Sequence, residues 1–172
     1  IKQHNEQEAF DYELFWERSL ACAVSAKLIM KNVTKAQSEE IFVCGLMLNI
    51  GELLLARNFP QKYEKVVYES MQKKIELSIV ENEIIGTNHM YIGSEMAKHW
   101  GFPELISTCI AHHHQSNSYQ GIDKRQKLFI NVIYLSSILS EILYSKDPQN
   151  NLTLFRKESK EILNFADETI DT

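Results

Sequence analysis

Three consecutive histidines, His112 to His114, are the residues of this chain that most directly suggest chemistry, and His89 precedes them. Imidazole nitrogens bind transition metals, and together with carboxylates they hold the ions of hydrolytic centres while leaving a coordination position for water. Such a centre needs three or more ligands on facing elements. The first hypothesis is therefore a metal site built from His89 and the end of the histidine run.

A helical hairpin would bring these histidines together. Apolar residues at helical spacing predict one helix over residues 89–100 and another over residues 103–113, joined by a tight turn. The start of the first helix then lies beside the end of the second, so His89 should lie near His113 or His114. These two are neighbours on a helix and about 100° apart around it, so we do not expect both to reach one ion.

A structural role explains the same histidines without any ligand. Histidines in the last turn of a helix interact favourably with the helix dipole and with its unpaired carbonyl groups. His113 also falls on an apolar face with Cys109 and Ile110, where a hydrogen-bonded histidine would serve the core. His99 lies beside Trp100 at a helix end and is predicted to be on the surface. The spacing alone leaves both roles open.

The elements that must position these residues are helical nearly throughout. Gly and Pro are scarce, at 6 and 3, and no segment has a strong strand pattern. The predicted helices cover residues 10–30, 41–55, 61–73, 78–85, 89–100, 103–113, 125–144 and 152–165, with a loop at 115–123 and a break at 147–151. The almost wholly apolar helix over residues 41–55 should be the central one. We therefore expect one all-α domain over residues 1–172, a single compact helical bundle.

Composition excludes several classes of protein. The chain has 172 residues, enough to bury a core, and its net charge of −5 argues against a general nucleic-acid binder. It has no apolar run of membrane-spanning length and no signal-peptide pattern, so we expect a cytoplasmic protein without membrane contact. Cys22, Cys44 and Cys109 are odd in number, widely spaced and set among apolar residues, which predicts buried reduced thiols.

Five short segments, in order along the chain, resemble a known family. They are W-x-x-S-x-x-x-A at 16–23, G-L-x-x-x-I-G-x-L-x-L at 45–55, E-x-E-x-x-G-x-x-H-x-x-x-G at 81–93, W-G-x-P at 100–103 and I-x-x-H-H at 110–114. Together they resemble the HDOD domain, a relative of the HD metal-dependent phosphohydrolases that is found in bacterial signalling proteins. The resemblance covers residues 8–145. It implies a helical bundle of the HD-domain type.

The resemblance also implies where the metal ligands of HD proteins would fall. A first-helix histidine falls on Arg18, the His-Asp pair on Leu48 and Asn49, and a late aspartate near Ser137. The ligand positions that this chain does match are His89, His113 and His114.

These departures weigh against metal-dependent hydrolysis. Leu48 has no ligand atom, and Asn49 offers only a neutral carbonyl oxygen. Arg18 carries a fixed positive charge that would repel a metal ion. Three histidines without a carboxylate can in principle hold zinc. We nevertheless predict a protein that is not an enzyme, with no catalytic residue, no bound metal and no cofactor.

HDOD domains are regarded as non-catalytic modules, so the resemblance implies a regulatory output module of a bacterial signalling protein. It would act through contacts with protein partners or attached signalling domains. One alternative is a degenerate HD-type phosphodiesterase with weak metal-dependent activity. Another is a sensor that binds a nucleotide or other anion in the vestigial pocket, although the same side chains would equally form a self-satisfied polar network. The residues predicted for that pocket are Arg18, Asn49, His89, His113 and His114.

The resemblance implies one further feature at the start of the chain. Members of the family usually carry a helical segment before the helix with the W-x-x-S motif, and this chain starts after that segment. Some apolar surface of the first helices is then exposed or covered by another copy of the chain. Because exposed apolar surface promotes association, we expect a homodimer.

Overall fold

The computed structural model describes residues 10–34, 39–114, 119–144 and 148–170, and this part of the chain is helical without any strand. Its helices, in order, are α1 (Tyr12–Val33), α2 (Glu39–Met47), α3 (Ile50–Asn58), α4 (Pro60–Lys73), α5 (Leu77–Ile84), α6 (His89–His99), α7 (Glu104–His112), α8 (Lys124–Ile142), α9 (Pro148–Leu163) and α10 (Asp167–Ile170). The predicted all-α class is confirmed.

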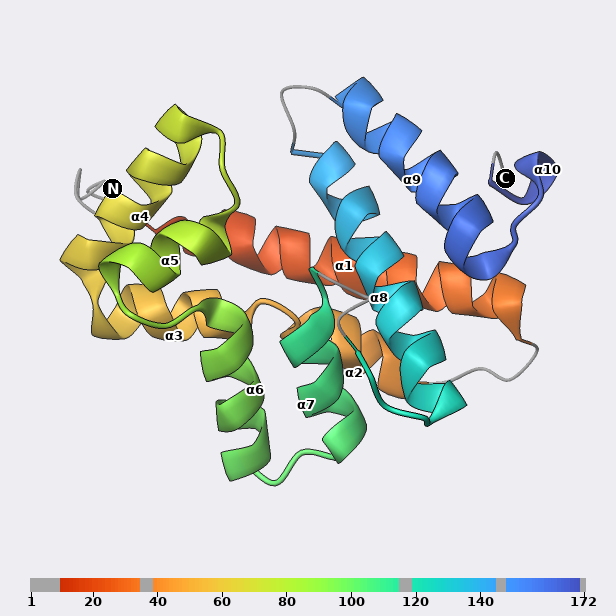
Figure 1. Ribbon diagram of the computed structural model, residues 1–172, viewed down its shortest axis with the longest axis horizontal. Helices are drawn as coiled ribbons and strands as arrows, with labels where there is room; N and C mark the ends of the chain where they lie inside the picture. The colour runs from red at the N-terminus through yellow and green to blue at the C-terminus, as the bar shows by residue number, and fades with distance from the viewer. Residues whose placement is uncertain (1–9, 35–38, 115–118, 145–147, 171–172) are drawn as a thin grey trace, which may run out of the picture.

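The long helix α1 crosses the whole molecule and organises the rest of the bundle (Figure 1). It packs on α2 and α8, while α9 lies along the other side of α8. Helices α6 and α7 form the predicted antiparallel hairpin, and α3 packs against the start of α6. One large cluster of buried apolar side chains joins α1, α2, α7 and α8. A smaller cluster around Leu55, Ala56 and Tyr63 joins α3 to α4.

The predicted central helix over residues 41–55 is wrong as a single element, because the chain breaks at Leu48 and Asn49 between α2 and α3. Asn49 has φ −98° and ψ 17°, outside helical geometry. The break lets α2 and α3 each pack closely against a different helix, α2 against α1 and α3 against α6. A Cβ on Gly45 would lie 2.7 Å from Ala23 Cα in α1, and a Cβ on Gly51 would lie 1.9 Å from the His89 carbonyl oxygen. Each half of the predicted helix thus fits a different neighbour.

The α6–α7 hairpin lies within one residue of its predicted boundaries, and local features mark the ends of α6. The Asn88 side chain accepts a hydrogen bond from Tyr91 N at 2.9 Å, which caps α6. Gly101 has φ 76°, the left-handed conformation that glycine adopts readily after a helix. The exposed position predicted for His99 is confirmed.

The C-terminal part differs from the prediction. Helix α9 begins at Pro148 rather than at Leu152, because proline fits the first turn of a helix, where its missing N–H is not needed. The break predicted at residues 147–151 is therefore helical from residue 148 onward. Of the loop predicted at 115–123, residues 115–118 lie outside the described part, and residues 119–123 are not helical.

Two expectations from composition can be compared with the structure. Cys22, Cys44 and Cys109 are all buried and all free, as predicted. Among the described residues, no helix is both long enough and apolar enough to cross a membrane.

Replacing Gly51 with alanine should destabilise the fold more than replacing Gly93. The Cβ at Gly51 would meet the His89 backbone, which cannot rotate away, whereas the nearest atom at Gly93 is Ile110 Cγ2, at 2.9 Å on a side chain that can shift. We expect the free energy of unfolding to fall by about 2–3 kcal/mol for Gly51→Ala and by less than about 1 kcal/mol for Gly93→Ala. Urea denaturation followed by circular dichroism measures both; equal losses would contradict the close approach of α3 to α6.

Candidate functional site

A cavity of about 400 Å³ opens between α1, α3, α6, α8 and α9. All five residues predicted for the vestigial pocket line it: Arg18, Asn49, His89, His113 and His114. Ser137, near which the resemblance places a late aspartate, lines it too. Leu48 does not; its side chain is 1% exposed and belongs to the apolar core. The structure thus brings the predicted residues together and puts Leu48 behind the cavity wall.

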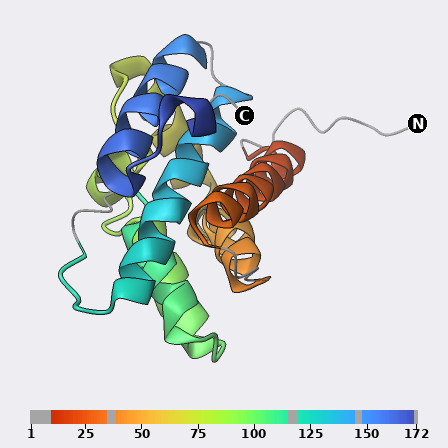
Figure 2. The same cartoon turned by 90° about the vertical axis from the view of Figure 1, so that its right-hand side faces the viewer.

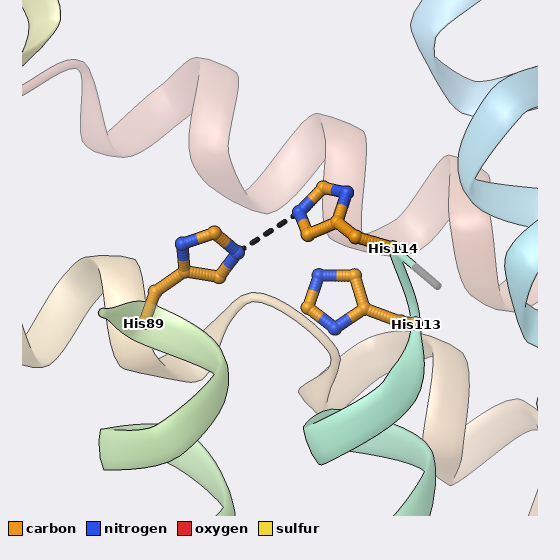
Figure 3. Close-up of side chains that lie close together, drawn as sticks. All are labelled: His89, His113 and His114. Carbon is orange, nitrogen blue, oxygen red and sulfur yellow. Dashed lines mark hydrogen bonds between the residues drawn. The ribbon is translucent and has the colours of Figure 1, made fainter. Parts of the chain in front are cut away.

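Three imidazoles meet in this cavity (Figure 3). His89 Nε2 and His114 Nε2 are 3.0 Å apart, and one ring nitrogen from each of His89, His113 and His114 lies within 4.8 Å of the others. The expectation that His113 and His114 cannot both reach one ion is therefore wrong. Helix α7 ends at His112, and His113 and His114 follow it, with His113 still at φ −68° and ψ −23°.

Glu81 of α5 fixes the orientation of His89. One carboxylate oxygen, Oε2, accepts a hydrogen bond from His89 N at 2.8 Å and lies 2.7 Å from His89 Nδ1. Both side chains are buried. A ring nitrogen bound to a carboxylate in this way carries the proton, so Nδ1 faces Glu81 and Nε2 faces His114.

The pKa values of the three histidines are shifted in different directions. Burial opposes the charged form of His89, but its hydrogen bond to Glu81 and the nearby Glu52 outweigh burial and raise its pKa. Burial and the neighbouring imidazoles lower the pKa of His113 well below its usual value. Burial, with His89 and Arg18 nearby, lowers the pKa of His114 to about 3. The pKa values of His89 and His114 are thus shifted in opposite directions, although their Nε2 atoms are in contact.

His113 is held at one ring nitrogen only. Its Nδ1 donates to the Ile110 carbonyl oxygen at 2.7 Å. Its Nε2 is buried and has no hydrogen-bond partner among the described residues. Figure 3 shows the second ring nitrogen turned toward the space between His89 and His114. The hydrogen-bonded core role predicted for His113 therefore accounts for only half of its polar atoms.

Sequence reasoning missed the carboxylates of the cavity. Glu52 and Glu141 line it, and Glu81 lies behind His89. Glu52 is buried and accepts a hydrogen bond from Tyr63 Oη at 3.5 Å; burial raises its pKa against the opposing effects of His89 and Arg18. A single acid inside the apolar segment G-E-L-L-L was the signal that could have identified Glu52. Glu141 carries no comparable signal, because acids are common near the end of an exposed helix face.

Arg18 and Glu141 form an ion pair that links α1 to α8 at the cavity. The guanidinium is mostly buried, and its Nε has no hydrogen-bond partner within the described residues. Its positive charge contributes to the low pKa of His114. Arg18 therefore lines the cavity, as the sequence predicted. Its positive charge is neutralised by Glu141, which the sequence analysis did not identify.

The ligand set suits one ion rather than a hydrolytic pair of ions. Zinc–nitrogen bonds of about 2.0–2.1 Å place two tetrahedral ligands roughly 3.4 Å apart, a spacing that the three imidazoles reach with small shifts. Leu48 and Asn49 stand where HD proteins have their ligand pair, and Leu48 is in the core. Among the residues that the structure describes, no second group of three potential metal ligands lies beside Leu48 and Asn49.

Comparison with known proteins finds a matching family model and several similar structures. The model of the HDOD domain family matches residues 1–116. A Geobacter sulfurreducens HDOD domain protein of unknown function has a similar structure, with a TM-score of 0.73, 22% identity, and coverage of 92% of this chain and 55% of that one. A Shewanella amazonensis SB2B protein named as a candidate phosphohydrolase has a TM-score of 0.72 and 18% identity, with coverage of 93% of this chain and 57% of that one.

A third solved structure is the MmoQ response regulator of Methylococcus capsulatus strain Bath. It has a TM-score of 0.68 and 26% identity, with coverage of 95% of this chain and 61% of that protein. This chain spans less than two thirds of the length of each of these three proteins. Together they confirm the helical bundle that the resemblance implied.

Acid should destabilise the fold through His113 and His114. Both have a lowered pKa in the folded protein, so below the ordinary value of 6.5 the unfolded chain binds more protons. The free energy of unfolding should then fall as the pH drops from 6.5 toward 3, by up to about 1.4 kcal/mol per pH unit for each histidine. His89 acts with the opposite sign: because its pKa is raised, its contribution is complete below 6.5 and is lost as the pH rises through the raised value.

Urea denaturation at several pH values between about 7 and 4 measures this dependence, with His114→Gln as the comparison. The variant lacks one titrating imidazole and should show a shallower slope than the wild type. His99→Gln, which replaces an exposed histidine, is the matched control and should leave the slope unchanged. Identical slopes for wild type and His114→Gln would contradict the assignment of a neutral His114.

Proposed function

The chain belongs to the HDOD domain family, and on that premise we propose that it is a non-catalytic signalling module. It acts through contacts with protein partners or with signalling domains attached to it in a longer protein. The likeness to a response regulator supports this proposal, as does the incomplete ligand set of the cavity.

The observation that carries the proposal is the ion pair of Arg18 and Glu141 inside the cavity. Position 18 is where the resemblance places a histidine ligand. A guanidinium is always charged and offers no lone pair, so it cannot bind a metal and it repels a cation nearby. Glu141, the carboxylate that would attract a cation, is engaged by Arg18. The reactive half of an HD centre is thus replaced by a self-neutralised pair.

The residues at positions 48 and 49 also support a non-catalytic role. Leu48 is 1% exposed and packs in the apolar core, so this position adds stability rather than a ligand. Asn49 lines the cavity with an uncharged amide. A nucleophilic water needs a cation and an adjacent base to form a hydroxide, and this side of the cavity supplies neither.

The cavity also suits a polar network better than an anion site. Glu52 and Glu141 both line it, and either carboxylate in its charged form repels a phosphate. Arg18, the cation that would hold an anion, is already paired with Glu141. These charges weigh against the nucleotide sensor among the alternatives.

A second candidate function, the binding of a single structural metal ion, is favoured by the convergence of His89, His113 and His114. Two features fit such an ion. His113 Nε2 is buried without a hydrogen-bond partner in the described structure, and Glu81 holds Nδ1 of His89 as an outer carboxylate holds a metal-bound imidazole. A bound ion would supply a fixed positive charge that links the start of α6 to the end of α7.

We expect the purified chain to release no nitrophenolate from bis(p-nitrophenyl) phosphate in the presence of manganese, iron, nickel or zinc, beyond the rate of the metal alone. The physical reason is the missing ligand pair and the cation at Arg18. His89→Ala serves as a control for contaminating hydrolases. Turnover by the wild type that disappears in His89→Ala would overturn the non-catalytic proposal.

For the structural ion, we expect one zinc ion per chain after dialysis and a melting temperature that rises with free zinc, because a ligand bound only by the folded state stabilises it. His89→Ala and His113→Ala should lose both effects. His112→Ala is the matched control, since His112 belongs to the same histidine run but not to the converging set. Zinc bound equally well by His89→Ala, or none bound by the wild type, would rule out this second candidate.

A further inference from the structure

Two residues that line the cavity each have a buried polar atom without a hydrogen-bond partner in the described part of the chain. The atoms are His113 Nε2 and Arg18 Nε, and the cavity has a volume of about 400 Å³. Leaving a buried polar atom unpaired is costly, so such atoms in native proteins are usually completed by ordered water, an ion or a ligand. The two atoms therefore indicate that the cavity has an occupant.

The two atoms need opposite groups from that occupant. His113 Nδ1 donates to the Ile110 carbonyl oxygen, and burial holds the pKa of this ring well below its usual value. The neutral ring carries its one proton on Nδ1, so Nε2 is an acceptor and needs an N–H or O–H donor. Arg18 Nε carries a hydrogen atom and needs an acceptor. A metal ion would complete His113 alone, whereas a molecule with both groups completes both residues.

The charges around the cavity already compensate one another. Arg18 pairs with Glu141, and His89 Nδ1 lies 2.7 Å from Glu81 Oε2. Burial raises the pKa of the Glu52 carboxyl group, which favours its neutral form. An ion that entered this cavity would lose its hydration without gaining an unpaired charge of opposite sign. The arrangement therefore favours an uncharged occupant.

The remaining lining suits a flat apolar body. Leu77, Ile138 and Leu154 line the cavity together with the aromatic side chain of Tyr134. Figure 2 shows α8 (cyan), which carries Tyr134 and Ile138, between α1 (red to orange) and α9 (blue). The volume is near the lower end of the roughly 300–1,000 Å³ of small-molecule sites, which suits a molecule of one or two rings.

From these observations we infer that the cavity binds a small uncharged molecule with a flat apolar ring and an amide-type edge, meaning an N–H donor beside a carbonyl acceptor. The N–H group completes His113 Nε2 and the carbonyl group completes Arg18 Nε, while the ring lies against Tyr134 and Ile138. This inference goes beyond the proposed function, because it gives the signalling module an input. The binding itself does not depend on that role.

Four probes built on one ring test the charge and the donor. Benzamide is uncharged and has the amide edge, benzoate is an anion, benzamidine is a cation at neutral pH, and N,N-dimethylbenzamide keeps the carbonyl group without the N–H. Titration of the ¹⁵N-labelled whole chain in EDTA, followed by NMR, gives the Kd of each probe. We expect a Kd of about 1 mM for benzamide, which is typical of so small a ligand. The other three should bind at least about tenfold more weakly, because each adds an uncompensated charge or leaves His113 Nε2 unpaired.

Substitutions that line the cavity test where benzamide binds. Arg18→Lys keeps a positive charge beside Glu141 but has no Nε–H, and Ser137→Leu fills part of the cavity. Each should weaken benzamide binding at least about fivefold. Thr153→Leu is the matched control, since Thr153 is exposed on α9 and its hydroxyl, like that of Ser137, donates to a carbonyl of its own helix. It should leave the Kd unchanged, and circular dichroism verifies that each variant is folded.

His113→Phe tests the donor contact directly. The variant keeps a ring at this position but removes the acceptor, so the preference for benzamide over N,N-dimethylbenzamide should fall from at least about tenfold to less than about twofold. A purely structural role of His113 would leave that preference unchanged. If His113→Phe does not fold, Arg18→Lys and Ser137→Leu still decide the inference.

Several outcomes would overturn the inference. Tightest binding of benzoate would indicate an anion site, and tightest binding of benzamidine a cation site. No binding of any probe would mean that the cavity holds water only, and binding unchanged in Ser137→Leu would place the probe elsewhere. Metal-dependent release of nitrophenolate would overturn the proposed non-catalytic function but not this inference, because benzamide binding is measured without metal.

Discussion

The hydrogen bonds between Glu81 and His89 are the interaction on which the cavity depends. A carboxylate buried away from water is costly unless it is neutralised and hydrogen-bonded. Here one oxygen accepts from both the backbone and the ring of His89, and the raised pKa of the ring supplies the compensating charge. The same bonds orient the ring of His89 and direct its Nε2 at His114. Burial, with His89 nearby, lowers the pKa of the other two imidazoles.

Close packing of α3 against α6 also holds His89 in place. The backbone of His89 lies directly against Gly51, where no side chain would fit. The start of α6 is thus held by α5 through a carboxylate and by α3 through close packing of the backbone. A histidine held in this way cannot swing out of the cavity without opening two helix contacts. The rigidity explains why an unpartnered nitrogen of His113 can persist beside it.

Local patterns predicted much of this molecule, because helices depend on spacing, caps and glycines that stand close together in the sequence. Apolar spacing predicted the two helices of the hairpin, and hairpin geometry correctly placed His89 beside the histidine run. The single helix over residues 41–55 failed because its break serves contacts with α1 and α6, which no local pattern reveals.

The candidate site was predicted less completely than the fold. The five pocket residues were chosen on the resemblance, and they do line one cavity. The convergence of His113 with His114 was missed, because it depends on the last residue of α7, the least predictable part of any helix. Glu141 was missed because its role comes from the distant Arg18, with which it pairs across the bundle.

Helix α1 connects the interior of this protein with its surface. Arg18 points into the cavity from the same helix that exposes Leu20 on the outside, less than one turn away. A change of charge in the cavity that alters the Arg18–Glu141 pair therefore acts on the helix that carries this exposed residue. A ligand of the cavity and a partner on the exposed side of α1 would then be coupled, each changing the affinity for the other by the same factor. One rigid helix thus joins an internal polar site to an exposed surface.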